Sequence, residues 1–404
     1  MALYADVSYD SRVQREAATL VADGHEVTIV CLSGSAPVDA PFRVVAGLPP
    51  RGGVLPDGGS PFLLVEGASA PRRLAARGRW LAGYARAIRS WGRWAVETAG
   101  AVDAWHAHDL TGLAAVGPLV LSPTRLVYDS HEIFLETGTA ARLPGVGRRL
   151  LRRLERWLVG RADALVTVNE AYARVLERRT RPRRVVVVRN CPPRQEEVAD
   201  RDISPLRRAV GIPVETPLLL YHGALAPHRG IEATALALLE PGLESAHAAI
   251  LGFGSLRTDL EAMATDPRFE GRLHLLDAVP PDELLGWVAG ADVDVIALER
   301  STLNHWFCTP NKLWESIAVG VPVVVSDFPV MSEIVCDDPM GPLGATCDPT
   351  DVRSVAAAVR SVVDLLPDER WVMRARCAAA ARERWNWETE SARLVALYRD
   401  LATG

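Results

Sequence analysis

The stretch LYADVSYDSRVQREAATLVADGHEVTIVCL, residues 3–32, decides the fold class. A short apolar run, LYAD, precedes an amphipathic segment that is expected to be helical from about Ser11 to Ala22, and a β-branched run, EVTIVCL, follows it. Gly24 can adopt the left-handed conformation that ends a helix, so the second strand is expected to start within two residues. A strand, a helix and a strand joined in this way predict a β-α-β unit with parallel strands.

The same alternation continues along the chain. The later strand-like runs are RLVYDS, ALVTV and RVVVV in the first half and PLLLYHG, HAAILGFG, LHLLDAV, VDVIAL and PVVVS in the second. Between the two series, the paired prolines and the charge run of residues 190–215 indicate a linker. We therefore predict an α/β protein with two Rossmann-like, doubly wound domains, residues 1–190 and 191–385. Residues 386–404 are expected to form a helix that docks on one domain or crosses back to the first.

The composition limits the possible protein classes. The chain has 404 residues, of which 49% are hydrophobic and 24% charged, as in a soluble globular protein with two or three domains. Its six cysteines are scattered, so we expect reduced thiols, no disulfide and no structural zinc. No apolar run approaches the roughly 18 residues of a membrane span, and the N-terminus does not resemble a signal peptide. A cytoplasmic protein is expected.

Charge is distributed unevenly along the chain. Residues 1–190 hold 26 arginines against 18 acidic residues, whereas residues 191–404 hold 19 basic residues against 32 acidic ones. Two arginine-rich segments, residues 71–94 and 142–161, carry Trp and Leu at recurring positions. They either rest on an anionic membrane at its inner face, hold a phosphorylated lipid, or are packing helices with solvated arginines. Nucleic-acid binding is not expected, because no aromatic-basic strand motif accompanies the charge.

The stretch CTPNKLWE, residues 308–315, contains the one lysine of the chain, Lys312, against 44 arginines. Pro310 and Asn311 form a turn that opens a helix, and a helix N-terminus offers free N–H groups and a positive dipole end to a phosphate. Lys312 adds a mobile charge, and Glu315, one turn later, can accept hydrogen bonds from a ribose diol. The alternatives are a solvated lysine and a capping carboxylate. Because every other basic Lys or Arg position of the chain is an arginine, the lysine at this position favours a phosphate site.

Two glycine-containing turns follow strands of the second half. In YHGALAPHRGIE, Gly223 permits close backbone approach, and Arg229 lies where a guanidinium either binds a diphosphate through two hydrogen bonds or points into solvent. In LGFGSL, Gly252 and Gly254 lie between a strand and a helix. This second motif is an incomplete dinucleotide fingerprint, because the third glycine and the later acidic residue are missing. The absence of a G-x-x-x-x-G-K-[ST] loop argues against a nucleotide hydrolase.

Polar side chains follow two strands of the first half, in WHAHDLTG and YDSHEIF. Parallel strands end at one edge of a sheet, so these residues are expected to face the same ligand-binding edge. A lone histidine is usually structural, but two His-acid pairs favour a polar site. The pairs comprise His106, His108, Asp109, Asp129, His131 and Glu132. The Asp-x-Asp pattern of Asp292 and Asp294 is instead attributed to the strand pleat and to strand-start capping, so no metal site is predicted there.

Taken together, these stretches resemble glycosyltransferase family four, whose members have the GT-B fold and are retaining enzymes that use nucleotide-diphosphate sugars. The likeness extends in order over nearly the whole chain, and PNKLWE followed by GVPVVVS is its most specific part. It implies two Rossmann-like domains facing an interdomain cleft, the N-terminal one binding the acceptor and the C-terminal one the donor. It also implies transfer of a sugar to a hydroxyl group of a glycan, a lipid-linked acceptor or a natural product, with the donor as co-substrate and without a metal or other cofactor.

The resemblance implies roles for individual residues. Arg229 and Lys312 would hold the diphosphate, Glu315 the ribose, the backbone near Val279 the base, and His131 the donor sugar at the acceptor side. Further donor contacts are implied at Gly223, Gly252, Gly254, Asn304, Pro310, Asn311 and Leu313, and acceptor-side contacts at His108, Asp109 and Glu132.

The sequence departs from the family pattern at two positions. Phe307 stands where the first glutamate of the Glu-x7-Glu pattern is expected, so the sugar contact would come from Asn304 or from backbone amides. Ala224 stands where an arginine is frequent, so Lys312 would neutralise more of the phosphate charge. Two other functions stay open: a nucleotide-sugar epimerase or phosphorylase on the same scaffold, and a non-catalytic protein that binds sugar nucleotides.

Overall fold

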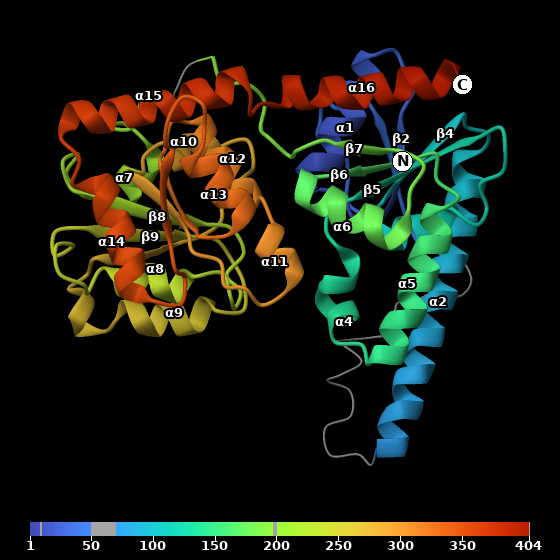
Figure 1. The fold of residues 1–404 in the computed structure, drawn as a ribbon, viewed down its shortest axis with the longest axis horizontal. Helices are drawn as coiled ribbons and strands as arrows, with labels where there is room; N and C mark the ends of the chain where they lie inside the picture. The colour runs from blue at the N-terminus through green and yellow to red at the C-terminus, as the bar shows by residue number, and fades with distance from the viewer. Residues whose placement is uncertain (9, 50–69, 197–199, 404) are drawn as a thin grey trace. The chain divides into compact units, whose positions relative to one another are not determined.

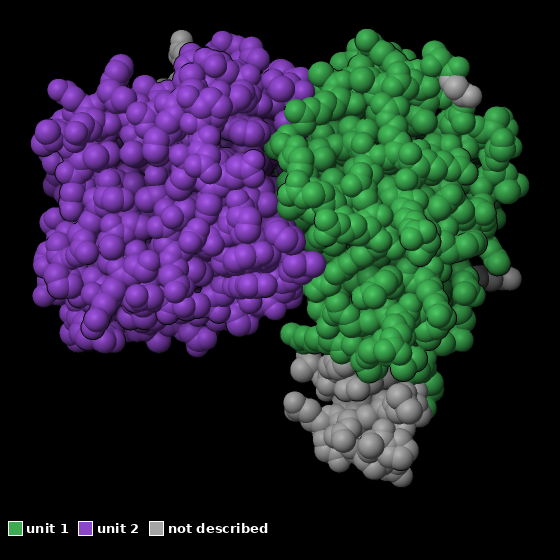
Figure 2. Space-filling view, viewed as in Figure 1, with its two compact units in different colours: residues 1–189, 391–404 green, residues 190–390 purple. Residues whose placement is uncertain are grey.

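The chain divides into two compact units, which are described separately (Figures 1 and 2). The computed structural model describes residues 1–8, 10–49, 70–196 and 200–403. The first unit comprises residues 1–189 and 391–404, and the second comprises residues 190–390. Within the described residues, no helix combines the length and the hydropathy needed to cross a membrane.

A parallel sheet forms the centre of the first unit. Its seven described strands follow the order β3-β2-β1-β4-β5-β6-β7, so the strand order reverses between β1 and β4. Such a reversal leaves room for a ligand at the carboxyl ends of the two central strands. The strands are β1 (Ala2–Asp6), β2 (Thr28–Ser33), β3 (Arg43–Ala46), β4 (Ala104–His108), β5 (Arg125–Ser130), β6 (Ala164–Thr167) and β7 (Val185–Val187).

The predicted opening β-α-β unit is confirmed. β1 and β2 pair in parallel, with Leu3 opposite Cys31. The helix between them, α1, begins where the Asp10 side chain accepts a hydrogen bond from the Val13 N–H, and Gly24 after it has a φ of 94°. The other helices of this unit are α2 (Ala70–Ala99), α3 (Asp109–Val116), η1 (Phe134–Glu136), α4 (Gly138–Ala141), α5 (Gly145–Val159) and α6 (Glu170–Thr180), and α1 spans Ser11–Ala22.

A second parallel sheet forms the centre of the second unit. Its six described strands follow the order β10-β9-β8-β11-β12-β13, with the reversal between β8 and β11. The strands are β8 (Leu218–His222), β9 (His247–Leu251), β10 (Leu273–Leu276), β11 (Val293–Ile296), β12 (Val323–Ser326) and β13 (Gly344–Cys347). β8, β11 and β12 are buried over their whole length, as expected for parallel strands covered by helices on both faces.

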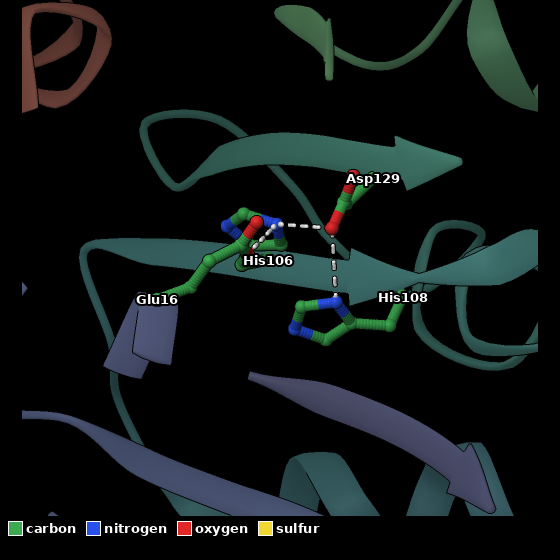
Figure 3. A group of neighbouring side chains, drawn as sticks. All are labelled: Glu16, His106, His108 and Asp129. Carbon is green, nitrogen blue, oxygen red and sulfur yellow. Dashed lines mark ion pairs between the residues drawn. The ribbon is translucent and has the colours of Figure 1, made fainter. Parts of the chain in front are cut away.

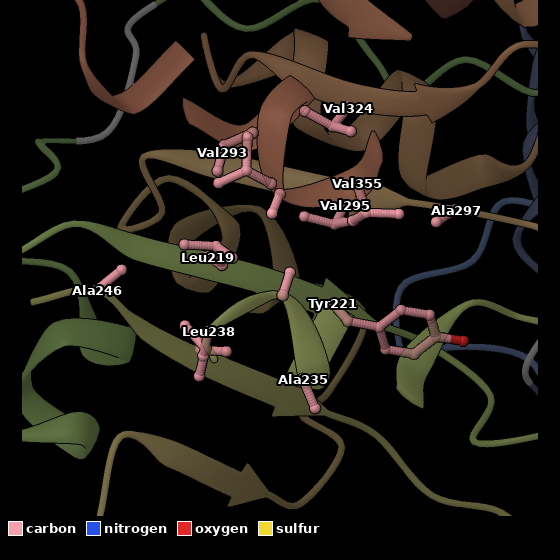
Figure 4. Packing of buried hydrophobic residues seen from close by; sticks show 14 of the residues in the cluster. Leu219, Tyr221, Ala235, Leu238, Ala246, Val293, Val295, Ala297, Val324 and Val355 are labelled. Atoms are coloured by element: carbon pink, nitrogen blue, oxygen red, sulfur yellow. The ribbon is translucent and has the colours of Figure 1, made fainter. Parts of the chain in front are cut away.

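The core of the second unit lies between this sheet and its covering helices. Leu219 on β8 and Val293 and Val295 on β11 pack with Ala235 of α8 and Val355 of α14 (Figure 4). The helices are α7 (Pro205–Val210), α8 (Ile231–Ala237), α9 (Arg257–Ala264), η2 (Pro267–Phe269), α10 (Leu284–Val288), α11 (Leu303–Phe307), α12 (Asn311–Ala318), α13 (Pro329–Cys336), α14 (Val352–Val363) and α15 (Pro367–Glu383).

The predicted linker, residues 190–215, is only partly irregular. It contains α7, whose Leu206 is fully buried in the core of the second unit. Arg207 of the same helix is also buried; its Nε donates to the Gly290 carbonyl at 2.9 Å, and its Nη2 lies 2.5 Å from Asp292. The sequence does not predict this helix, because six residues with two adjacent arginines are too few to show the periodic spacing of apolar residues that indicates a helix.

The last helix, α16 (Trp387–Thr403), begins in the second unit and ends in the first, because the boundary between the units falls between Glu390 and Ser391. In the first unit its Leu394 and Leu397 are fully buried. Its Tyr398 hydroxyl lies 2.9 Å from Nδ1 of His106. The aromatic and aliphatic residues of this segment are therefore packing residues.

Candidate functional site

In the second unit, the loops after β8 and β9 approach each other through their backbones. The Gly223 N–H donates to the Leu251 carbonyl at 2.9 Å. A Cβ added to Gly252 would lie 2.0 Å from the carbonyl oxygen of Gly223, and one added to Gly254 would lie 2.3 Å from that of Leu225. The glycines predicted as donor contacts are therefore required first of all by the contact between these two loops.

Replacing Gly252 by Ala is expected to destabilise the second unit by about 1–3 kcal/mol, because overpacking forces the backbone apart. Urea unfolding monitored by circular dichroism measures this loss. The matched control is Gly286→Ala in α10, where an added Cβ meets no atom within 4 Å. There we expect an unchanged free energy of unfolding or a gain of up to about 1 kcal/mol. Equal effects in the two variants would contradict the close approach.

Lys312 lies in the first turn of α12, and its Nζ is enclosed. That atom has no hydrogen-bond partner among the described residues and lies 3.4 Å from the centroid of the Tyr221 ring. Burial lowers the pKa of Lys312 to about 7; the charge of Arg229 acts in the same direction, and Asp294 and Glu315 oppose it. A buried ammonium without an anionic partner is costly. Lys312 therefore places an enclosed amine, whose hydrogen-bonding capacity the described residues do not use, at the start of α12.

Glu315, one turn further along α12, is held by His222 at the end of β8. His222 Nε2 lies 3.1 Å from Glu315 Oε2, and His222 Nδ1 lies 3.5 Å from Asp294 Oδ2. Ser316 Oγ also donates to Asp294 at 2.8 Å. Burial alone would lower the pKa of His222, but the two carboxylates outweigh it and raise the pKa to about 9. His222 is thus a cation between two carboxylates, and the sequence motifs did not identify it.

The remaining residues predicted for donor binding lie on several elements of the second unit. Arg229 is half-buried and close enough to lower the pKa values of Lys312 and His305. Leu313 is fully buried, and its N–H already donates to the Pro310 carbonyl at 3.0 Å, so it contributes packing. The others are Asn311, whose Oδ1 accepts from Asn190 at 3.0 Å, Asn304, which is buried in α11, Val279, which is half-buried after β10, and Pro310, which immediately precedes α12. Phe307, which stands where the family has a glutamate, ends α11.

The two aspartates of the Asp-x-Asp pattern have different partners. Asp292 accepts the Leu218 N–H at 2.8 Å and pairs with Arg201 at 2.7 Å and with Arg207. Its carboxylate therefore joins two strands at their start, as the capping interpretation predicts. Asp294 instead faces His222 and Ser316, so it belongs to the surroundings of Lys312 and Glu315.

In the first unit, side chains from α1, β4 and β5 form a buried charge cluster (Figure 3). Nε and Nη2 of Arg12 each lie 2.8 Å from an oxygen of Asp129, and Nη2 lies 3.0 Å from Glu16 Oε1. His108 Nδ1 lies 3.3 Å from Asp129, and His106 Nε2 lies 3.3 Å from Glu16. Every member is at most 2% exposed. Asp129 is the centre of this cluster.

His131 lies beside the cluster and is partly exposed. Its Nε2 lies 3.0 Å from Asp129 Oδ2, and its backbone N–H donates to Asp109 Oδ1 at 3.3 Å. Burial would lower the pKa of His131, but Asp109 and Asp129 outweigh it and raise the pKa to about 10. The structure therefore brings together His108, Asp109 and a cationic His131, whereas Glu132 next to them is exposed on the surface.

Glu16, His106, His108 and Asp129 offer four potential metal-ligand atoms within 4.8 Å of one another. Two features disfavour a divalent ion at this point. The buried guanidinium of Arg12 already pairs with both carboxylates and would repel a second cation. Burial also raises the pKa of Glu16 to about 8, which favours its protonated, non-ligating form. The cluster is therefore better described as an ion-pair network.

Comparison with known proteins relates both units to one enzyme class. Residues 11–192 match the profile "Glycosyltransferase Family 4", and residues 216–364 match the profile "Glycosyl transferases group 1". D-inositol 3-phosphate glycosyltransferase of Acidothermus cellulolyticus is 28% identical over 273 residues, which cover 64% of this chain and 57% of that protein. The chain spans a little more than half the length of the first curated relatives it matches.

Solved structures extend the likeness to the whole chain. Sucrose-phosphate synthase from Thermosynechococcus elongatus has a TM-score of 0.69 at 14% identity, covering 100% of this chain and 98% of the other. HepE from Anabaena in complex with UDP has a TM-score of 0.67 at 15% identity and covers 99% of each chain. At this identity the likeness shows the fold, and the predicted GT-B fold is confirmed.

Proposed function

The chain belongs to the family-4 type of glycosyltransferases, and we propose that it moves a sugar from a nucleoside-diphosphate donor to an acceptor hydroxyl. The observation that carries this proposal is the enclosed Lys312 amine, which has no hydrogen-bond partner among the described residues and lies where α12 begins. Donor binding is assigned to the second unit, with Arg229 and Lys312 on the diphosphate and Glu315 on the ribose. UDP in the HepE complex is a ligand of the same chemical class.

The proposed chemistry is electrostatic. As the sugar leaves, negative charge develops on the diphosphate, and Arg229, Lys312 and the first N–H groups of α12 stabilise it. These groups would neutralise the leaving group without a metal. Retention of configuration would follow from attack on the face from which the diphosphate leaves, with a diphosphate oxygen taking the proton of the acceptor hydroxyl.

Acceptor binding is assigned to the first unit. The cationic His131 supports a role beside the donor sugar, because Asp129 holds Nε2 while Nδ1, 3.8 Å from Asp109 Oδ2 and beyond hydrogen-bond distance of it, can donate a hydrogen bond. His108 and Asp109 position this ring, and Glu132 lies exposed beside them. A glycan, a lipid-linked acceptor and a small natural product are all compatible with this set of groups.

A thermal-shift screen with UDP, GDP and ADP, followed by the sugar nucleotides of the best base, tests the proposal. We expect one nucleoside diphosphate to raise the melting temperature and its sugar nucleotide to yield a glycosylated product or slow hydrolysis. A rearranged donor without transfer would indicate an epimerase, and binding without turnover in any acceptor mixture would indicate a binding protein. No shift with any nucleotide would overturn the proposal.

We further propose that α5 contacts an anionic membrane surface. Its exposed apolar residues recur at helical spacing on one face and are 43–67% exposed. Exposed arginines follow the adjacent face. The apolar residues are Val146, Leu150, Leu154 and Trp157, and the arginines are Arg149, Arg152, Arg153 and Arg156. This pattern is typical of a helix that lies in the membrane interface.

In the other arginine-rich segment, by contrast, Ile88 and Trp91 of α2 are buried, so that part is a packing helix.

Sedimentation with phosphatidylglycerol vesicles at low salt tests the membrane contact. Trp157→Glu is expected to weaken vesicle binding about tenfold or more, because it places a charge in the apolar face. Trp371→Glu is the matched control, since Trp371 is 70% exposed on α15 of the other unit. Equal binding by both variants, or no binding by the unaltered protein, would contradict the contact.

Diphosphate binding at pH 8 is expected to take up about one proton per site. The pKa of Lys312 is about 7 in the free protein, so its amine is mostly neutral at pH 8, and a bound diphosphate favours the ammonium. For the same reason the free protein should gain stability from this group as pH rises from 7 towards the unfolded pKa near 10.5.

Calorimetry in buffers of different ionisation enthalpy measures the proton uptake. Lys312→Arg is the control, because a guanidinium stays charged throughout this range and takes up no proton. Equal uptake by the two proteins would contradict the assignment to Lys312.

A further inference from the structure

We infer that His222 is a positioning residue that fixes the Glu315 carboxylate for a ribose hydroxyl and thereby makes the site select ribonucleotides over deoxyribonucleotides. The inference rests on the proposed function, in which Glu315 binds the donor ribose. It concerns a residue at the end of β8 that touches no ligand in this scheme and acts through its neighbour.

The geometry gives His222 two anchors. It is 2% exposed and lies between Asp294 on β11, at 3.5 Å from its Nδ1, and Glu315 on α12, at 3.1 Å from its Nε2. β8 and β11 are paired, with Leu220 opposite Asp294, so the first anchor belongs to the rigid sheet. The ring therefore fixes the Glu315 carboxylate, one turn into α12, relative to the sheet.

Glu315 needs such an anchor because its side chain is flexible and lies at the edge of the site. Its side chain is 23% exposed. His222 occupies Oε2, and Oε1 has no hydrogen-bond donor among the described residues. A glutamate without a partner samples several rotamers, and ordering them on ligand binding costs free energy. With Oε2 held by His222, Oε1 keeps its capacity to accept a hydrogen bond from a ribose hydroxyl.

The charges around His222 support this arrangement. Asp294 also accepts a hydrogen bond from Ser316 of α12, so it is fixed independently of His222. Lys312 is also close to Glu315 and Asp294. It does not compete with His222 for Oε2 of Glu315, because its Nζ lies over the Tyr221 ring. A hydrogen bond to a charged group is among the stronger ones in proteins. A deoxynucleotide cannot form the hydrogen bond from the ribose hydroxyl to Glu315, and the loss of that bond should weaken binding roughly 10- to 100-fold.

A matched pair of neutral substitutions tests the inference. His222→Gln places an amide N–H near the position of Nε2 and can still reach Glu315. His222→Asn places its amide near the position of Nδ1, close to Asp294, and cannot reach Glu315. Both side chains are polar and smaller than or similar in size to histidine, so both variants should fold. Full-length proteins are titrated calorimetrically with UDP, GDP and ADP, and the best binder is compared with its 2′-deoxy and 3′-deoxy analogues and with pyrophosphate.

The unaltered protein is expected to prefer the ribonucleotide at least tenfold over one of the deoxy analogues. His222→Gln should keep this ratio within about threefold, whereas His222→Asn should bring it close to one, as Glu315→Ala does. Pyrophosphate affinity should stay the same in all proteins, and adding Glu315→Ala to His222→Asn should cause no further loss.

Each contrary outcome has a separate meaning. If His222→Asn keeps the ribose preference, the inference is overturned and the proposed function stands. If His222→Asn weakens the ribonucleotide, the deoxy analogues and pyrophosphate equally, His222 serves the fold and the inference is also overturned. If the unaltered protein binds none of the nucleotides, the proposed function and the inference fail together.

Discussion

Lys312→Ala is expected to lower sugar transfer by roughly 100-fold or more while the protein stays folded. The charge that develops on the leaving diphosphate is stabilised most by cations that are already in place and shielded from water. Lys312 is shielded from water, since its Nζ is enclosed against the Tyr221 ring, and a bound diphosphate favours its charged form. Ala224 stands where this family often has an arginine, so Arg229 is the one other cation assigned to the diphosphate.

Steady-state rates and melting temperatures together measure this effect. Removing a buried amine that lacks a partner should leave the melting temperature unchanged or slightly raise it. Arg268→Ala is the control for loss of a positive charge, because Arg268 is in the same unit and its side chain is 67% exposed. A Lys312→Ala protein that turns over at a near-normal rate would rule out this residue as the main cation, whatever its stability.

Asp129→Asn is expected to destabilise the first unit by about 3–5 kcal/mol, because breaking a buried ion pair leaves the other charge uncompensated. Asp129 is fully buried and accepts two hydrogen bonds from the Arg12 guanidinium, which is itself 2% exposed. Asparagine keeps the shape of the side chain, so the loss of stability measures the effect of removing the negative charge. His131, which is also held by Asp129, should lose its fixed orientation and transfer should fall as well.

Urea unfolding at pH 7 measures the change, and the double variant Arg12→Met, Asp129→Leu is the control. Replacing both partners by apolar residues removes the Arg12 charge that the single variant leaves without Asp129, so the double variant should be more stable than Asp129→Asn. Glu16 loses its ion pair with Arg12 in the double variant and is expected to be protonated there, because burial already raises its pKa to about 8. A double variant as unstable as the single one would show that the pair is not the cause.

The pH dependence of stability provides a second check on Asp129. Burial would raise the pKa of Asp129, but Arg12 and His131 outweigh it and hold the pKa well below its usual range. A carboxylate of this kind contributes stability at neutral pH that is lost as pH falls through its folded pKa. The acid side of the stability profile should therefore be flatter in Asp129→Asn than in the unaltered protein.

The fold class and the turn at Lys312 could be predicted from local sequence. Strand and helix periods and the glycine that ends α1 are properties of short stretches, so residues 3–32 were enough to predict β1, α1 and β2. The turn at Pro310 also follows from local chemistry, since proline suits the start of a helix. The same reasoning missed α7, because six residues with two arginines have no visible period.

The pairing of the charged residues follows from the tertiary structure and from no local motif. His222 and Glu315 are 93 residues apart in the chain, and Arg12 and Asp129 are 117 apart. Neither pair has a motif that connects its members, and each depends on which strands become neighbours and on the direction of one side chain. Local sequence is enough to predict which helices and strands form and that the one lysine lies in the first turn of a helix, because both features depend on neighbouring residues in the chain. The pairing of charges in the interior depends on packing and desolvation, which exist only once the chain has folded.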